Sequence, residues 1–127
     1  MIVLDTHALI WWLSEPRKLT RKASRALGKA RRVGIPAISA WEVAVLVSRG
    51  RIRLDRSPLE WLNAALAEPR VELLPLTPSV AVHSTRLGPT LADPADRLIV
   101  ATALAEAAPL VSADQRIAAL AGVDVVW

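Results

Sequence analysis

Short apolar runs and amphipathic segments alternate along this chain of 127 residues. The first run, residues 2–4, is entirely apolar and predicts a buried strand that ends at Asp5. Four later, mainly apolar runs predict further short strands at residues 33–38, 71–74, 110–112 and 123–126. Short strands of this continuous apolar kind are typical of parallel sheets that are covered on both faces.

Helix signals fill the segments between these runs. The predicted helices cover residues 6–13, 20–30, 39–47, 57–67, 77–86, 93–107 and 114–120. In segment 20–30, Ala23, Leu27 and Ala30 share one face and basic residues occupy the other. A capping residue followed by proline opens three of the helices. The alternation predicts an α/β fold, a three-layer α/β/α sandwich around a mostly parallel five-stranded sheet, and the length fits one domain, residues 1–127.

Composition removes several classes of site. The chain has no cysteine, which excludes a disulfide scaffold, a thiolate nucleophile and any zinc site that uses cysteine. His7 and His83 are the only histidines, so a metal would be held by Asp and Glu oxygens, as Mg²⁺ and Mn²⁺ prefer. The sequence has no uncharged apolar run of about 18 residues and no signal-peptide pattern. We therefore expect no membrane association and a cytoplasmic location.

Positive charge is concentrated in one part of the chain, although the formal net charge is only +4. Twelve of the 16 basic residues lie between Arg17 and Arg56, where Glu42 and Asp55 are the only acids. Each basic residue taken alone is explained by a solvated helix face. The cluster as a whole favours an anionic partner, with nucleic acid the first candidate and an acidic protein an equal fit.

Four acidic residues recur where predicted strands end or the following helices begin. Asp5 follows the first strand, Glu42 lies in the helix after the second, Asp96 lies in the first turn of the long helix, and Asp114 follows the fourth strand. Sites in open parallel sheets form beyond the carboxyl ends of the strands. Clustered carboxylates repel one another unless a cation joins them, and such a site suits metal-assisted phosphodiester hydrolysis.

Each of these acids also has a structural explanation. Ser39 and Glu42 match a capping box, in which Glu42 would bind the Ser39 backbone. Asp93 matches an N-cap, and an acid at Asp96 suits the helix dipole. Asp114 also fits an ordinary turn. A site is therefore indicated by the four acids together, and by the cost of a charge directly after a buried strand.

The whole chain resembles a known family. Residues 2–13 (IVLDTHALIWWL) resemble the opening motif of PIN-domain ribonucleases, and in particular of the VapC-type toxins of toxin–antitoxin pairs. Residues 38–44, 93–103 and 110–114 resemble the second, third and fourth motifs, and residues 125–127 resemble the closing strand. The first three motifs in this order are specific to the family, whereas the fourth alone is weak.

The resemblance implies a PIN fold and an Mg²⁺- or Mn²⁺-dependent endoribonuclease that cleaves tRNA or another structured RNA and inhibits translation. It carries over a catalytic and metal-binding quartet: Asp5, Glu42, Asp96 and Asp114. Groups expected to support the ligands are Thr6, Ser39 and Asp93, with the N-cap role preferred for Asp93. Arg97 is a candidate RNA contact, the alternative being a surface ion pair. His7 belongs to the opening motif without a catalytic role, and His83 is expected on a helix surface.

The implied mechanism is hydrolytic. A water activated by the metal, with help from Asp114 or Glu42, would attack the phosphorus in line and release a 3′-hydroxyl and a 5′-phosphate. Two departures affect RNA specificity: residues 89–92 lack the His or Arg that many relatives carry there, and Leu46 replaces a Lys found in some. We also expect the basic span to surround the acidic centre and guide RNA toward it.

The implied partners are a VapB-like antitoxin, whose tail would block the active site, and a second copy of the chain in a homodimer. The proposed antitoxin groove consists of Trp12, Leu13, Val43, Leu46 and Val47. Two other functions stay open: a non-catalytic RNA-binding or regulatory module, and a phosphomonoesterase. The phosphomonoesterases that place an Asp after the first strand use a second Asp two residues later, where this chain has His7.

Overall fold

The central feature of the computed structural model, which describes residues 1–127, is a sheet of five parallel strands in the order β3-β2-β1-β4-β5. The strands are β1 (Ile2–Leu4), β2 (Val33–Pro36), β3 (Val71–Leu74), β4 (Leu110–Val111) and β5 (Val125–Val126). The sequence predicted all five. With β1 central, all strands run in one direction, so their carboxyl ends meet at one edge of the molecule.

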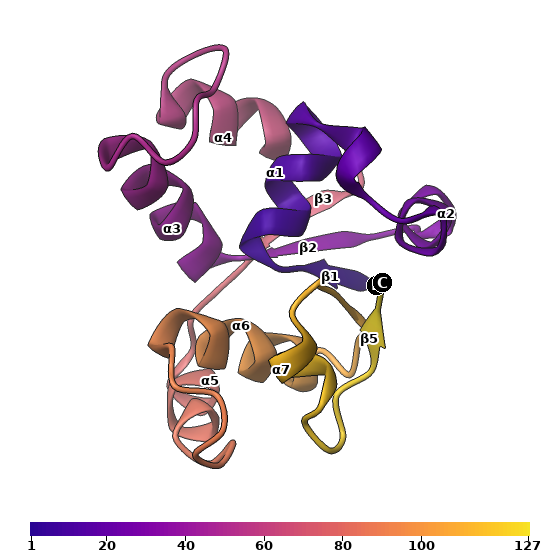
Figure 1. Ribbon diagram of the computed structural model, residues 1–127, viewed down its shortest axis with the longest axis vertical. Helices are drawn as coiled ribbons and strands as arrows, with labels where there is room; N and C mark the ends of the chain where they lie inside the picture. Colours follow the sequence, from indigo (N-terminus) through magenta and orange to yellow (C-terminus); the bar gives the residue numbers. More distant parts are fainter.

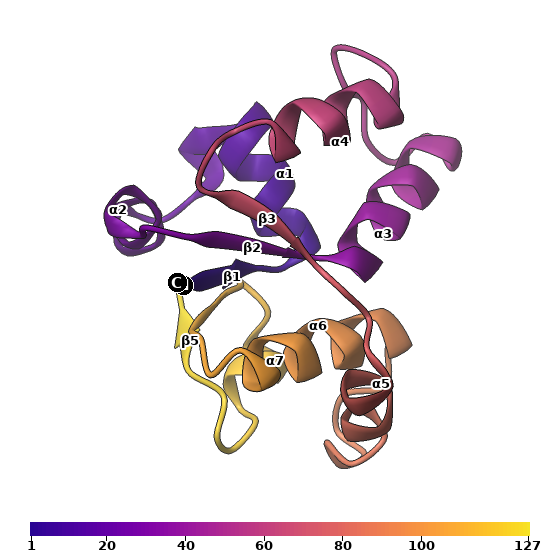
Figure 2. The ribbon, with the colours of Figure 1, turned by 180° about the vertical axis from the view of Figure 1, so that it is seen from behind.

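Helices cover both faces of this sheet. They are α1 (Thr6–Ser14), α2 (Arg21–Lys29), α3 (Ala37–Ser48), α4 (Pro58–Leu66), α5 (Pro78–Ser84), α6 (Pro94–Ala105) and α7 (Gln115–Ala118), with the short 3₁₀ helix η1 (Pro16–Lys18). Helices α1, α3 and α4 lie on one side and α5, α6 and α7 on the other (Figures 1 and 2). Helix α2 stands beyond the end of the sheet where the strands begin, near the C-terminus (Figure 1). The predicted α/β/α sandwich is confirmed.

Strand β1 joins the two halves of the hydrophobic core. Ile2 and Leu4 belong to a cluster shared with α1, α2, α3 and α4, whereas Val3 belongs to a cluster shared with α6 and α7. All three side chains are buried because successive residues of a strand point to opposite faces of the sheet. Replacing Leu4 by alanine would cost about 2–5 kcal/mol of stability. This packing on both faces fixes the position of the next residue, Asp5.

Two element boundaries differ from the prediction. The second strand ends at Pro36 instead of residue 38, and α3 begins at Ala37, so Ser39 lies inside the helix and does not cap it. The predicted capping box is therefore wrong. Helix α6 ends at Ala105 instead of residue 107 because Ala107 adopts a left-handed conformation with φ 49°. The amides of Ala107 and Ala108 then bind the carbonyls of Leu104 and Ala103, a helix stop usually marked by glycine.

None of these helices combines the length and the apolar character needed to cross a lipid bilayer.

Candidate active site

Asp5 is a buried carboxylate at the carboxyl end of β1. It caps α1, since its Oδ1 accepts a hydrogen bond of 2.8 Å from the amide of Ala8. Only 9% of the residue is exposed. Burial raises the pKa of Asp5, while the Ser112 hydroxyl and the Ala8 amide oppose that rise. The carboxylate is thus held in one place by the strand before it and the helix after it.

Glu42 projects from α3 toward the start of α1. The Oγ1 atom of Thr6 donates a hydrogen bond of 2.5 Å to Glu42 Oε1, which joins two residues 36 positions apart. Burial raises the pKa of Glu42, the Thr6 hydroxyl lowers it, and the negative charges of Asp93 and Asp5 raise it further. The partner of Glu42 is therefore on another helix, where the capping-box interpretation had placed it on Ser39.

The first turn of α6 brings two more acids to the same edge. Asp93 is the N-cap, and its Oδ1 accepts hydrogen bonds from the amides of Ala95 (2.8 Å) and Asp96 (3.4 Å). The preferred N-cap interpretation of Asp93 is confirmed. Burial raises the pKa of Asp96 to about 6, and the negative charges of Asp93, Glu42 and Asp114 contribute to that rise.

Asp114 caps α7 and is paired with an arginine that the sequence analysis missed. Arg116 donates to Asp114 from its backbone amide (2.9 Å), from Nε (3.1 Å) and from Nη2 (2.7 Å), and this guanidinium lowers the pKa of Asp114. The same Nη2 lies 3.8 Å from Asp96 Oδ2. A capping Asp followed two residues later by Arg was visible in the sequence, but its proximity to Asp96 required the fold.

These residues line one cleft of about 510 Å³. Its walls are Asp5, Thr6, His7, Trp11, Glu42, Asp93, Asp96, Ala113, Asp114 and Arg116. The fold therefore brings together the four acids singled out in the sequence, from four separate elements. Ser39 is the exception among the expected supporting groups, because it is fully buried outside the cleft and its hydroxyl has no hydrogen-bond partner.

An aromatic wall borders the acids. The Trp11 ring lies 5.7 Å from the ring of His7 and 5.5 Å from that of Trp127, between ring centres. His7, which was given no part in the site, is thus exposed on the cleft wall. His83 lies exposed on α5, as predicted.

The donors in the cleft suit a divalent cation by their chemistry. They are carboxylate oxygens, the ligands of hard cations, and the pKa of Asp96 is raised by burial and by repulsion from Asp93, Glu42 and Asp114, a repulsion that a cation would relieve. In this conformation, no three Asp, Glu or His side chains are close enough to hold an ion. Two of the acids have other partners, Thr6 for Glu42 and Arg116 for Asp114. Binding an ion at the quartet thus requires these side chains to turn.

Arg97 has a structural role that neither expectation described. Its Nε donates to the carbonyl of Ser84 (2.9 Å), and its Nη1 donates to those of Gly88 and Leu91 (both 2.6 Å). The expected surface ion pair is absent. The guanidinium is turned toward the backbone of the segment between α5 and α6, so we do not retain Arg97 as an RNA contact.

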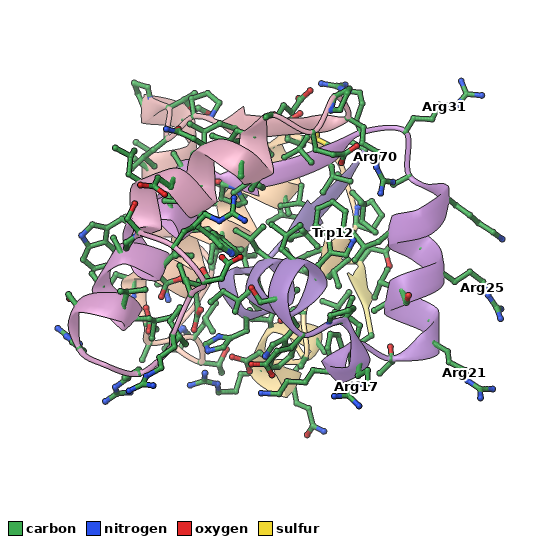
Figure 3. All side chains as sticks on the ribbon, turned by 90° about the horizontal axis from the view of Figure 1, so that it is seen from above. Trp12, Arg17, Arg21, Arg25, Arg31 and Arg70 are labelled. Carbon is green, nitrogen blue, oxygen red and sulfur yellow. The ribbon has the colours of Figure 1, made fainter.

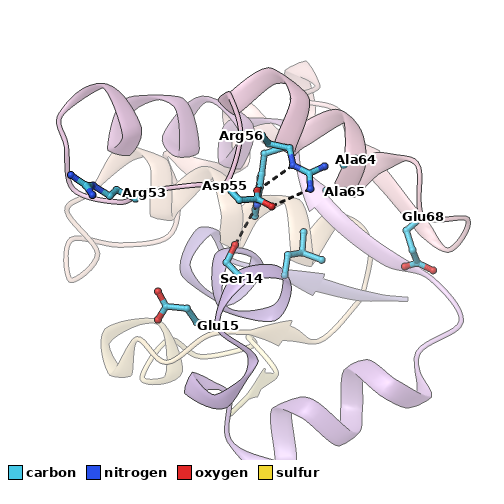
Figure 4. A pocket seen from close by; sticks show the side chains of 10 residues that line it. Ser14, Glu15, Arg53, Asp55, Arg56, Ala64, Ala65 and Glu68 are labelled. Carbon is cyan, nitrogen blue, oxygen red and sulfur yellow. Dashed lines mark hydrogen bonds and ion pairs between the residues drawn. The ribbon is translucent and has the colours of Figure 1, made fainter.

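The expected partner groove is also revised. Val43 is fully buried in the core and cannot form part of a surface groove, whereas Trp12, Leu46 and Val47 are half-buried and Leu13 is exposed. Leu13 instead lines a separate pocket of about 540 Å³ between the end of α1 and α4 (Figure 4). In this pocket the Trp61 indole lies 3.3 Å from the Ser14 hydroxyl.

Comparisons with known proteins agree with this arrangement. The sequence profile of the PIN domain matches residues 2–123. The chain is 41% identical to Ribonuclease VapC22 of Mycobacterium tuberculosis over 117 residues, which cover 91% of this chain and 88% of that protein. This chain is a VapC-type PIN domain. The matched residues of the PIN domain include all four acids of the cleft.

Solved structures share the PIN fold. VapBC2 from Rickettsia felis, bound to a promoter DNA fragment, aligns with a TM-score of 0.73 at 19% identity, over 98% of this chain and 97% of the other. DNA-bound VapBC from Salmonella typhimurium aligns with a TM-score of 0.72 at 16% identity, over 98% and 95%. At these identities the similarity concerns the fold, and both neighbours are toxin–antitoxin complexes.

Proposed function

We propose that this PIN domain is a divalent-metal-dependent endoribonuclease and the toxin of a toxin–antitoxin pair. Its substrate would be tRNA or another structured RNA in the cytoplasm, and cleavage would inhibit translation. The observation that carries the proposal is the single cleft that Asp5, Glu42, Asp96 and Asp114 line together. Membership of the VapC-type family, which includes a protein named as a ribonuclease, supports it.

Asp5 and Asp96 are the residues best placed to hold Mg²⁺ or Mn²⁺. Asp5 is fixed between β1 and α1, and Asp96 faces the three other negative charges that raise its pKa. When bound, the cation supplies Lewis-acid polarisation of the phosphate and compensates its negative charge. The protein then needs only to keep the carboxylates of Asp5 and Asp96 in position.

Glu42 is the candidate general base for the attacking water. Burial raises its pKa above the usual value, which makes this carboxylate a better proton acceptor. Thr6 orients this carboxylate through its hydroxyl. Asp114 is the alternative base, but its pairing with Arg116 lowers its pKa and makes it a weaker proton acceptor. Arg116, with a side chain 63% exposed on the cleft wall, supplies positive charge for a phosphate.

A direct assay tests the proposal. Purified protein is incubated with tRNA in Mg²⁺, Mn²⁺ or EDTA, beside Asp96→Asn and the matched control Asp124→Asn, which lies outside the cleft. We expect cleavage that EDTA and Asp96→Asn abolish and that Asp124→Asn retains. Cleavage that survives both EDTA and Asp96→Asn would contradict the mechanism. RNA binding without cleavage would indicate a binding module, and hydrolysis of phosphomonoesters alone would indicate a phosphatase.

We further propose a VapB-like antitoxin as the partner, and a homodimer as the toxin's own assembly. Exposed apolar side chains are available for such contacts, among them Leu13 (40% exposed) beside the pocket of Figure 4 and Leu59 (69%) on α4. Co-expression with the antitoxin should give a pair that co-purifies, and Leu13→Asp should weaken it. Failure to co-purify would contradict the partner proposal and leave the nuclease proposal standing.

A further inference from the structure

Helix α2 and the residues beside it carry a row of exposed cations. We define the α2 basic face as Arg17, Arg21, Lys22, Arg25, Lys29 and Arg31, all of which are exposed. Figure 3 shows Arg17, Arg21, Arg25 and Arg31 extending away from the body of the protein. No member forms an ion pair, and the sequence has no acidic residue between Glu15 and Glu42.

The fold does not need these charges. Ala23 and Leu27 supply the buried contacts of α2, on the opposite side of the helix. Arg21 and Lys22 occupy the first turn, where the helix dipole disfavours cations. Arg25 is four residues from both Arg21 and Lys29, a spacing at which like charges destabilise a helix. The charges therefore reduce the stability of the element that bears them.

Several basic residues elsewhere have partners, although Arg49, Arg51, Arg53 and Arg86 are also exposed and form no ion pair. Arg32 pairs with Glu72 (2.5 Å) and Arg56 pairs with Asp55 (3.1 Å). Arg70 binds the carbonyls of Leu27 and Ala30 and lies over the Trp12 ring, so it anchors α2 to the sheet (Figure 3). The anchored helix holds the unpaired cations in fixed positions.

The α2 basic face also lies away from the cleft. Helix α2 stands at the end of the sheet where the strands begin, and none of its residues lines the cleft (Figure 1). The expectation that the basic span surrounds the acidic centre is therefore wrong for α2. A ligand of this face contacts the protein outside the cleft.

The chemistry of the face identifies its ligand. The exposed positions of α2 are occupied only by Arg, Lys, Ser and Gly, so the face lacks the aromatic and apolar anchors on which protein partners depend. It also lacks aromatic rings for stacking unpaired bases. What it offers is a series of guanidinium and ammonium groups, with Arg21 and Arg25 about 6 Å apart along the helix axis. Arginine binds phosphate in a bidentate manner.

We propose that the α2 basic face binds the phosphate backbone of a double-helical segment of the RNA substrate, at a distance from the bond that is cut. The inference depends on the proposed function for the identity of the RNA. Contact with phosphates alone positions a nucleic acid without reading its sequence. The face would therefore bind RNA by the shape and charge of its backbone and not by its sequence.

The test compares two variants that lose the same charge. Arg21→Gln/Arg25→Gln/Lys29→Gln removes half of the face, and Arg49→Gln/Arg51→Gln/Arg86→Gln removes three exposed cations elsewhere. Binding of a fluorescent RNA hairpin is measured by anisotropy over a NaCl series, in EDTA. Because each phosphate contact contributes a slope of about 0.7–0.9 in log Kd against log salt, we expect the slope to fall by about 2 in the α2 variant alone. The control variant should retain the wild-type slope.

Kinetics provide a second readout. On the hairpin, the α2 variant should show a higher KM with an unchanged kcat, since a distant contact binds substrate and transition state equally. On a short single-stranded oligonucleotide that only the cleft can hold, KM should not change. An unchanged salt slope in the α2 variant, or an equal loss in the control, would overturn the inference.

Loss of antitoxin binding by the α2 variant, with RNA binding intact, would overturn it as well and assign the face to a protein. These failures leave the nuclease proposal untouched if the wild type cleaves RNA. The converse result is a wild-type protein that cleaves no RNA, with a salt slope that still falls in the α2 variant. That result would support RNA binding by the α2 basic face and contradict the proposed function.

Discussion

The acidic cleft and the α2 basic face both bring like charges together, but they differ in the burial of those charges and in their partners within the chain. In the cleft, the buried Asp5 and the half-buried Glu42 and Asp114 accept hydrogen bonds within the chain, from Ala8, Thr6 and Arg116 respectively. On α2, the cations are exposed and form no ion pair. The cleft thus stores repulsion in a low-dielectric site, where it acts strongly on pKa values, whereas water and salt screen the repulsion on α2. The cleft therefore suits the proposed chemistry, and the α2 basic face suits the proposed reversible binding.

Asp96→Asn should separate activity from stability most strongly. Losing this ligand should slow RNA cleavage by about 10²–10³-fold, because the cation that it would hold stabilises transition-state charge. It should also stabilise the metal-free protein by about 1–2 kcal/mol at neutral pH, since it removes a charge whose burial, together with repulsion from neighbouring acids, raises the Asp96 pKa to about 6. Steady-state kinetics and urea unfolding measure the two effects. A less active and less stable variant would show that Asp96 is only structural.

Thr6→Val tests how the cleft holds its acids. Loss of the hydroxyl that binds Glu42 should lower kcat by about 10–100-fold, the usual effect of removing a group that orients a ligand. It should also shift the acidic limb of the pH–rate profile to higher pH. The Thr6 hydroxyl lowers the Glu42 pKa, so its loss raises that pKa. Thr6→Ser retains the hydroxyl and should restore both values. A lower rate with an unmoved profile would argue against Glu42 as the base.

The metal-free protein should become less stable as pH rises from 5 to 7. The folded pKa of Asp96 is about 6 against an ordinary value of 3.8, so between these values the folded state binds more protons than the unfolded state. The free energy of unfolding then falls with increasing pH. We expect a decrease of about 1–2 kcal/mol by urea unfolding. Asp124→Asn should retain this decrease and Asp96→Asn should reduce it; equal slopes in both would contradict the assignment.

The smallest effect is expected on α2, where solvent already screens the charges. Arg21→Gln/Arg25→Gln/Lys29→Gln removes two like-charge pairs, each worth roughly 0.2–0.5 kcal/mol in an exposed helix. The variant should therefore be as stable as the wild type or slightly more stable in thermal unfolding, most clearly at low salt. Marked destabilisation would mean that these cations have a structural role after all.

The sequence predicted elements and candidate residues better than it predicted partners. Apolar runs identify strands because burial on both faces leaves no polar positions, and proline after a capping residue marks helix starts. A local pattern assigned Glu42 to Ser39, whereas the fold pairs it with Thr6 of another helix. Arg116 escaped notice because its importance depends on Asp96, 20 positions earlier in the sequence and 3.8 Å away in space. The position of α2 opposite the cleft likewise follows from topology and not from charge pattern.

The position of Trp11 gives the cleft an optical signal of its own. The chain has five tryptophans and no tyrosine, so its ultraviolet emission comes from indole alone. Trp11 lines the acidic cleft and packs against Trp127, while Trp12 and Trp61 belong to other surroundings. A paramagnetic ion such as Mn²⁺ in the cleft would quench Trp11 and spare the more distant rings. Occupancy of the site is thereby readable without a label, a substrate or turnover.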